Sequence, residues 1–166
     1  LLHGMVETYP NLHQPHADVS IEFDELMVHG NEAALIQIFS NLLSNAVKFV
    51  APGVHPRVRV RAEMERESEK GANEDLGREN GRKVRICVED NGIGIPKEQQ
   101  EKIFGMFQRM HRAEEYPGTG IGLALVEKSL ERTGGEITVE SEPGKGSRFS
   151  ILLPLAAPGT EAQVKK

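Results

Sequence analysis

Apolar residues recur at the spacing of an amphipathic helix between residues 31 and 51. These apolar positions are Leu35, Ile38, Phe39, Leu42, Leu43, Ala46, Val47 and Val50. Asn31 is a suitable N-cap residue, and Glu32 beside it favours the positive end of a helix dipole. Pro52 and Gly53 are typical of a helix end. The pattern therefore predicts one long helix, from Asn31 to the Pro52–Gly53 pair, with one face on a core.

Alternation of apolar and polar residues predicts the strands. The segments that alternate are 19–23, 26–28, 57–64, 83–90, 136–141 and 147–154. Shorter helices are expected at 97–107 and 123–133, with Pro96 at the first position of the former and Gly134 closing the latter. Residues 1–8 are expected to end another helix, and a proline-containing connector follows them.

Three segments have no apolar pattern and are expected to lie outside the core. Residues 65–82 are charged and contain glycines, so they predict an exposed hairpin insertion, with a partner-binding segment as the alternative. Residues 108–122 are polar and end in glycines, which predicts a loop. Residues 155–166 predict a frayed tail.

Length, composition, net charge and cysteine content limit the classes of protein to which this chain can belong. A length of 166 residues with 38% hydrophobic residues suits one domain with its own core. A net charge of −5 does not suggest a nucleic-acid binder, and no apolar run approaches the roughly 20 residues that span a bilayer. The single cysteine, Cys87, is expected to be a buried structural thiol, which favours a reducing, cytoplasmic location. Because the chain opens abruptly and without a signal peptide, we expect a piece of a longer protein.

Asn41, Asn45 and Lys48 share one face of the predicted long helix, because they are four and then three residues apart. An amide oxygen is a suitable ligand for Mg²⁺ when a nucleotide's phosphates supply the negative charge. A lysine one turn further on would meet those phosphates. The alternative is a solvated polar face without any ligand.

The segment EDNGIGIP, residues 89–96, places Asp90 at the end of a predicted strand, with Gly92 and Gly94 just after it. A carboxylate there can accept a hydrogen bond from an exocyclic amino group such as that of adenine. The two glycines can adopt positive φ and let a flat ring approach the backbone. The alternative is a plain tight turn. A calcium loop is a poor fit, because its acidic spacing and distal Glu are missing.

The segment GTGIGLA, residues 118–124, places glycines directly before a predicted helix. Backbone N–H groups at the positive end of a helix form a cradle for phosphate. The spacing is neither the dinucleotide-binding fingerprint nor a Walker P-loop. The alternative is a flexible joint.

The order of these motifs resembles one protein family. NLLSNAVKF, DNGIGIP, IFGMFQR, GTGIGLALV and GGEITVESEPGKGSRFSILLP are similar to motifs of the catalytic, ATP-binding domain of sensor histidine kinases. That domain belongs to the superfamily shared with gyrase, the 90-kilodalton heat-shock chaperone and mismatch-repair ATPases. The resemblance covers residues 19–154, and the segment 109–125 is most similar to the phytochrome-related group. Residues 1–18 would then be the end of a helical domain and a linker, and 155–166 a flexible tail.

The resemblance implies an α/β fold of the Bergerat type. In this two-layer sandwich a mixed, mostly antiparallel sheet carries helices on one face, and ATP lies between helix and lid. Asn45 would coordinate Mg²⁺, and Asn41 holds the neighbouring polar position, where the gyrase and chaperone branch carries its hydrolytic glutamate. Lys48 and Phe49 would approach the phosphates and the ribose or base. Asp90 would read adenine, with the two glycines beside it.

Further roles follow for the second half of the chain. Phe104 and Phe107 would anchor the lid, and Arg109 would lie near the terminal phosphate. Ser147 would lie near the adenine. The residues of the phosphate-side hinge would be Gly118, Thr119, Gly120, Gly122 and Leu123.

The implied function is transfer of the γ-phosphate of ATP to a histidine on a separate dimerisation domain. ATP and Mg²⁺ are the implied cofactors, Asn41, Lys48 and Arg109 the implied catalytic residues, and a response-regulator receiver domain the further partner. One alternative is an ATP hydrolase or clamp of the gyrase and chaperone branch, which Asn41 disfavours because it is no general base. A non-catalytic nucleotide-binding module and a serine kinase related to anti-sigma factors are two more candidates.

Two features depart from the family pattern. The long helix starts with the residues at 31–34, Asn-Glu-Ala-Ala, where the family often has Asp-Pro-x-Arg, which weakens the expected contact with a helical domain. None of the six histidines is followed by an acid within a long amphipathic helix, the setting of a phosphoacceptor. We therefore expect a monomeric chain that binds ATP and depends on a helical domain that it lacks.

Overall fold

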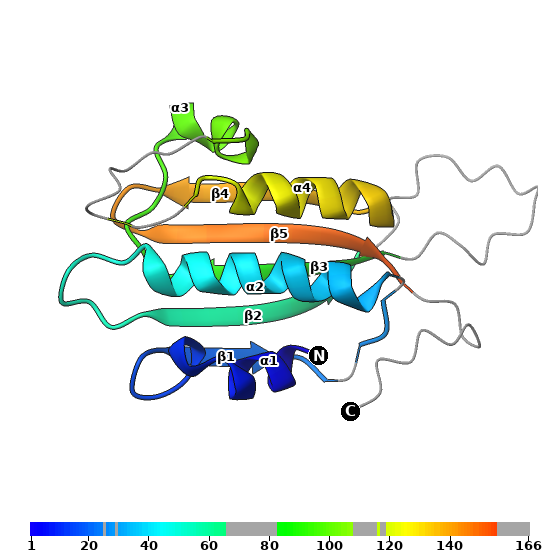
Figure 1. Ribbon diagram of the computed structural model, residues 1–166, viewed down its shortest axis with the longest axis horizontal. Helices are drawn as coiled ribbons and strands as arrows, with labels where there is room; N and C mark the ends of the chain where they lie inside the picture. The colour runs from blue at the N-terminus through cyan, green and yellow to red at the C-terminus, as the bar shows by residue number, and fades with distance from the viewer. Residues whose placement is uncertain (25, 29, 66–82, 108–115, 117–118, 156–166) are drawn as a thin grey trace, which may run out of the picture.

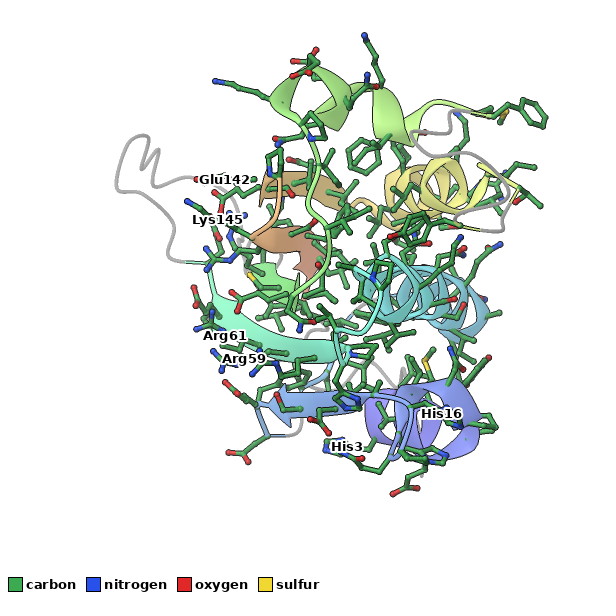
Figure 2. All side chains as sticks on the ribbon, turned by 90° about the vertical axis from the view of Figure 1, so that its left-hand side faces the viewer. His3, His16, Arg59, Arg61, Glu142 and Lys145 are labelled. Atoms are coloured by element: carbon green, nitrogen blue, oxygen red, sulfur yellow. The ribbon has the colours of Figure 1, made fainter. Side chains whose placement is uncertain are left out.

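A five-stranded sheet carries helices on one of its faces in the computed structural model (Figure 1). The structure describes residues 1–24, 26–28, 30–65, 83–107, 116 and 119–155. Figure 2, which looks along the strands, separates the molecule into a sheet layer and a helix layer. The expected two-layer α/β sandwich is confirmed.

The sheet is mixed and mostly antiparallel. Its strands are β1 (Asp18–Glu22), β2 (Arg57–Met64), β3 (Lys83–Asp90), β4 (Glu136–Glu142) and β5 (Gly146–Pro154), in the order β1-β2-β3-β5-β4. Only β1 and β2 run parallel to each other. The predicted strand at 26–28 is wrong, because within this described segment only Val28 pairs with another residue, in one isolated bridge with Leu155.

Three helices cover the sheet, namely α1 (Leu2–Thr8), α2 (Glu32–Lys48) and α4 (Gly122–Thr133) (Figure 1). The expected single helix at 97–107 is wrong, because it divides into α3 (Lys97–Gln100) and the short 3₁₀ helix η2 (Lys102–Phe104). Pro96 is the residue before α3, with ψ 142°, and not its first helical residue. The connector after α1 contains a second 3₁₀ helix, η1 (Pro10–Leu12).

The apolar stripe of α2 forms the centre of the core. Its buried residues are Leu35, Ile38, Phe39, Leu42, Leu43 and Ala46, all among those that the periodicity predicted. Burial of one such aliphatic side chain contributes roughly 1.5–3 kcal/mol. The Asn31 cap is confirmed, since its side chain accepts a hydrogen bond from Ala34 N at 3.2 Å. The helix ends at Lys48, before the predicted Pro52, because Phe49 leaves the helical backbone (φ −89°, ψ 56°).

The N-terminal segment packs onto the same core. Leu2 and Met5 of α1 and Leu12 of η1 are buried in one cluster with the apolar residues of α2. The expected helix at residues 1–8 is confirmed, and its apolar side chains contact the domain.

The two faces of the sheet differ sharply in polarity. The face away from the helices carries cross-strand ion pairs, such as Arg148 Nε with Glu89 at 2.7 Å, and Arg61 pairs with the same carboxylate. Arg59 and Arg61 point away from the helix layer in Figure 2. Cys87 lies within β3 and is 7% exposed, which confirms the expected buried thiol.

Candidate functional site

The helix-facing side of the sheet changes from apolar to polar at one end. Val60 of β2 and Val88 of β3 pair with each other and are fully buried. The next row of side chains on this face, at the end of β3, contains Asp90, Ser147 and Ser141. Ser147 pairs with Ser141 across β4 and β5, and its backbone N–H donates to Asp90 Oδ1 over 3.1 Å. Three polar side chains therefore lie next to one another at the edge of the core.

Asp90 is a partly buried carboxylate. Its Oδ1 accepts hydrogen bonds from the backbone N–H groups of Gly92, at 2.8 Å, and Ser147. Burial raises the pKa of Asp90 to about 6, although these two hydrogen bonds act in the opposite direction. No ion pair and no donor to Oδ2 is found for Asp90 among the residues that the structure describes. One oxygen is thus fixed in place, while the other remains an acceptor for a ligand.

The turn after Asp90 is packed too tightly for side chains. A Cβ on Gly92 would lie 2.4 Å from the carbonyl oxygen of Phe49. Gly94 has φ +73°, and a Cβ there would lie 2.0 Å from the carbonyl oxygen of Glu142. Both glycines are therefore required by contacts between backbone segments. The predicted approach of a flat ring to them stays a prediction.

Asn91 fixes the same turn on its other side. Its Oδ1 accepts a hydrogen bond from the Arg57 backbone N–H at 2.8 Å, and its Nδ2 donates to His55 O at 3.0 Å. The side chain thereby joins the end of β3 to the connection between α2 and β2. This supporting role was missed from the sequence, where Asn91 had only its place beside Asp90 as a signal.

The polar face of α2 is bounded by the start of α4. Asn41 donates from Nδ2 to Gln37 O at 2.8 Å, and its Oδ1 lies 2.6 Å from where a Cβ on Gly122 would be. The half-buried Asn45 makes no side-chain hydrogen bond within the described residues. Its amide oxygen is therefore available as a ligand.

Aromatic contacts surround the C-terminal end of α2. Lys48 Nζ lies 4.2 Å from the centroid of the Phe49 ring, a cation–π contact. The rings of Phe49 and Tyr116 are 5.3 Å apart, and Tyr116 donates from its hydroxyl to Val50 O at 3.1 Å. Sequence reasoning missed Tyr116, although it is an aromatic residue in an otherwise polar segment.

The start of α4 lacks a capping side chain among the residues that the structure describes. Ile121, the residue before the helix, makes no side-chain cap hydrogen bond, and the first turn of α4 contains no acidic residue. Gly120 turns the chain into the helix with φ 71°. The first backbone N–H groups of α4 can therefore bind an anion.

Comparison with known sequences decides the family. Residues 30–157 match the family described as histidine kinase-, DNA gyrase B-, and HSP90-like ATPase. The chain belongs to this ATPase family. Its fold and the polar row at the end of the sheet are consistent with that membership.

Relatives within the ATPase family include sensory kinases. The chain is 37% identical over 128 residues to the phytochrome-like protein Cph1 of Synechocystis sp., which covers 77% of this chain and 15% of that protein. It is 36% identical over 142 residues to the adaptive-response sensory kinase SasA of Thermosynechococcus vestitus, which covers 84% of this chain and 33% of that protein. The chain thus spans a third or less of the length of these two relatives.

Solved structures share the fold. Full-length ShkA, solved in complex with AMPPNP, matches 94% of this chain and 30% of its own length, with a TM-score of 0.67 and 26% identity. In the described part of this chain, no helix is both long and apolar enough to cross a membrane.

The remaining predicted residues of this ATPase site are placed as follows. Phe104 is partly buried against the core, whereas Phe107 is 73% exposed, so its anchoring role stays a prediction. Leu123 packs partly against the core and Thr119 is exposed. The predicted site residues Arg109 and Gly118 lie outside the described residues, as do residues 66–82 of the insertion predicted at 65–82 and residues 156–166 of the tail predicted at 155–166. Of the two remaining residues, Glu65 forms an ion pair with Arg85, and Leu155 forms a bridge with Val28.

Proposed function

We propose that this chain binds Mg-ATP and is the catalytic domain of a sensor histidine kinase. The observation that carries the proposal is the partly buried Asp90 carboxylate, whose turn the Phe49–Ile93 backbone contact joins to the end of α2. The names of the relatives, which are sensory kinases, support the same function. The AMPPNP bound to ShkA supports an adenine nucleotide as the ligand.

The base would bind at the end of the sheet. Asp90 Oδ1 is held by two backbone donors, so Oδ2 can accept a hydrogen bond from an exocyclic amino group. Phe49, whose ring already contacts Lys48 and Tyr116, would lie against the ribose or base.

The phosphates would lie between α2 and the start of α4. The approach of Asn41 to Gly122 brings these two elements together, and the first backbone N–H groups of α4, which no described side chain caps, are suited to anionic oxygens. The amide oxygen of Asn45 fits a hard cation whose remaining ligands are phosphate oxygens and water, since the described residues contain no cluster of three or more His, Cys, Asp or Glu. Mg²⁺, when bound, would neutralise charge on the phosphates. Lys48 and Arg109 would stabilise the transferred γ-phosphoryl group.

Transfer to a protein histidine fits the site better than hydrolysis does. A hydrolase needs a general base to activate water, and Asn41 is an amide whose Nδ2 is bonded to Gln37 O. The acceptor would be a histidine on a helical dimerisation domain, and a response-regulator receiver domain would take the phosphoryl group next. In this proposal the chain acts in the cytoplasm, is monomeric alone, and connects to the helical domain through residues 1–18.

Calorimetry with Mg-AMPPNP tests nucleotide binding. We expect the wild-type chain and an Asp24→Asn control to bind it, and Asp90→Asn to bind at least tenfold more weakly, because the amide offers a donor where an acceptor is needed. Asp24 is exposed, so the control has the same change in charge. Labelled ATP, mixed with the chain and the parent's helical domain, should place label on a histidine. Release of phosphate without labelling would favour the hydrolase.

A further inference from the structure

The hydroxyl of Ser141 uses its full hydrogen-bonding capacity. It donates to Gly146 O at 2.8 Å, accepts from the Ile95 backbone N–H at 2.8 Å, and lies 3.0 Å from Ser147 Oγ. A hydroxyl has one proton and two lone pairs. Because a carbonyl oxygen cannot donate, all three contacts are hydrogen bonds together only when Ser141 donates its proton to Gly146 O, on the strand that also carries Ser147.

This commitment fixes the direction of the contact between the two serines. Because Ser141 has no second proton, the 3.0 Å contact is a hydrogen bond only if Ser147 donates to Ser141. Ser147 Oγ then has only lone pairs left for any other partner. Asp90 lies beside Ser147 in the same row of the sheet and, when ionised, is also an acceptor only.

We propose that Ser141 is a positioning residue that sets base specificity: it holds the Ser147 hydroxyl as an acceptor, so that a purine edge meets two acceptors. The inference rests on the proposed nucleotide function and extends it. A 6-amino group, with two N–H donors, satisfies this arrangement. A 6-oxo group brings further lone pairs against the same acceptors, which is repulsive.

Gln100 provides a matched control in the same cluster. Its Nε2 donates to Ile95 O at 3.0 Å and to Ser141 O at 2.8 Å. It therefore supports the same backbone as Ser141 but takes no part in the chain of hydroxyl groups. Loss of the Gln100 side chain should therefore lower the affinity for all purine nucleotides by the same factor.

The test compares the affinities for Mg-ATP and Mg-inosine triphosphate, which has a 6-oxo group and no 2-amino group. Measured at about pH 7.5, where Asp90 is ionised, the wild type should prefer ATP. In Ser141→Ala the ATP preference should fall roughly five- to tenfold, because Ser147 becomes free to donate to the 6-oxo group. Ser141→Thr keeps a hydroxyl and should keep the preference, and Gln100→Ala should leave the ratio unchanged. In a Ser147→Ala background, Ser141→Ala should have no further effect on the ratio.

Several outcomes would overturn the proposal. If Ser141→Ala weakens both nucleotides by the same factor, Ser141 has a structural role only. If the wild type binds neither nucleotide, the proposed function fails as well, so the two failures are distinguishable. If circular dichroism shows that Ser141→Ala is unfolded, Ser141→Cys replaces it. A thiol has a similar shape but is a weak donor and acceptor, so this variant should also lose part of the preference for ATP.

Discussion

The backbone N–H of Ile93 donates to the carbonyl oxygen of Phe49 over 2.9 Å, which joins the turn after β3 to the end of α2. Phe49 is also the residue at which the chain leaves the helix. The residue that follows the long helix therefore also holds the segment that follows Asp90. This hydrogen bond connects the end of α2 to the turn that carries the acceptor at the end of the sheet.

Gly92→Ala should destabilise the fold by about 2 kcal/mol or more, because its Cβ would lie 2.4 Å from Phe49 O and neither backbone segment can move easily. Thermal unfolding should show a fall in Tm of several degrees. Gly4→Ala is the control, because Gly4 lies in α1 with nothing within 4 Å of its Cβ position. Alanine there should raise Tm slightly through its better helix propensity. An unchanged Tm for Gly92→Ala would contradict the packing described for this turn.

The ionisation of Asp90 should couple nucleotide binding to pH. Burial raises the pKa of Asp90 to about 6, and a ligand that donates to the carboxylate binds the ionised form. Nuclear magnetic resonance of the Asp90 side-chain carbon should therefore show a titration midpoint near pH 6 in the free protein and a lower midpoint with Mg-ATP. A midpoint near the ordinary value of 3.8 in the free protein would contradict the burial of this group.

Two neighbouring acids should have opposite effects on stability. The pKa of Asp90 is raised, so its contribution to stability is greatest below pH 4 and is lost as pH rises through about 6. Asp90→Asn should therefore stabilise the protein at neutral pH, by up to roughly 3 kcal/mol, while it weakens nucleotide binding at least tenfold. The gain should vanish near pH 4, where Asp90 itself is protonated. A destabilised Asp90→Asn would mean that the charge is better solvated than the structure indicates.

Glu89, on the opposite face of β3, behaves in the reverse way. Burial alone would raise its pKa, but hydrogen bonds from Arg61 and Arg148 outweigh burial and lower the pKa. The carboxylate therefore stabilises the fold above the ordinary pKa of a glutamate, and this contribution is lost as pH falls through the lowered value. Glu89→Gln should destabilise the protein by about 1–2 kcal/mol at neutral pH. Thermal unfolding of Asp90→Asn and Glu89→Gln at the same neutral pH measures this difference. If both variants changed the stability in the same direction, the prediction would be contradicted.

Local sequence patterns predicted most of the elements. The apolar period of α2 and the Asn31 cap depend only on neighbours along the chain, and the alternation in β2 and β3 reports one buried face. The end of α2 was predicted too late in the chain: the helix ends at Lys48, and the carbonyl group of Phe49 accepts a hydrogen bond from Ile93, which is distant in sequence. A pattern confined to the helix contains no signal for that contact.

The sequence singled out Asp90 and the polar face of α2 as parts of a candidate site, but it contained no signal for the groups that hold these residues in place. Ser141 looks like an ordinary strand residue in EITVES, and its role arises from partners on three other segments, including Ile95 and Ser147. The raised pKa of Asp90 likewise depends on how the folded chain excludes water from that carboxylate. The contacts of Ser141 and the raised pKa of Asp90 depend on the register of the strands and on burial, and both are set only when the sheet has formed.

Asn45 should determine how strongly nucleotide binding depends on Mg²⁺. Its side-chain amide makes no hydrogen bond within the part of the chain that the structure describes, so it can serve as a ligand without breaking an existing contact. Asn45→Ala should lower the affinity for Mg-ATP roughly tenfold or more. The affinity for ATP without metal, measured in the presence of a chelator, should change only slightly. Ser44→Ala, at the exposed neighbouring position, is the control and should leave both affinities unchanged. An equal loss with and without Mg²⁺ would mean that Asn45 contacts the nucleotide itself, and the proposed metal ligand would have to be sought elsewhere.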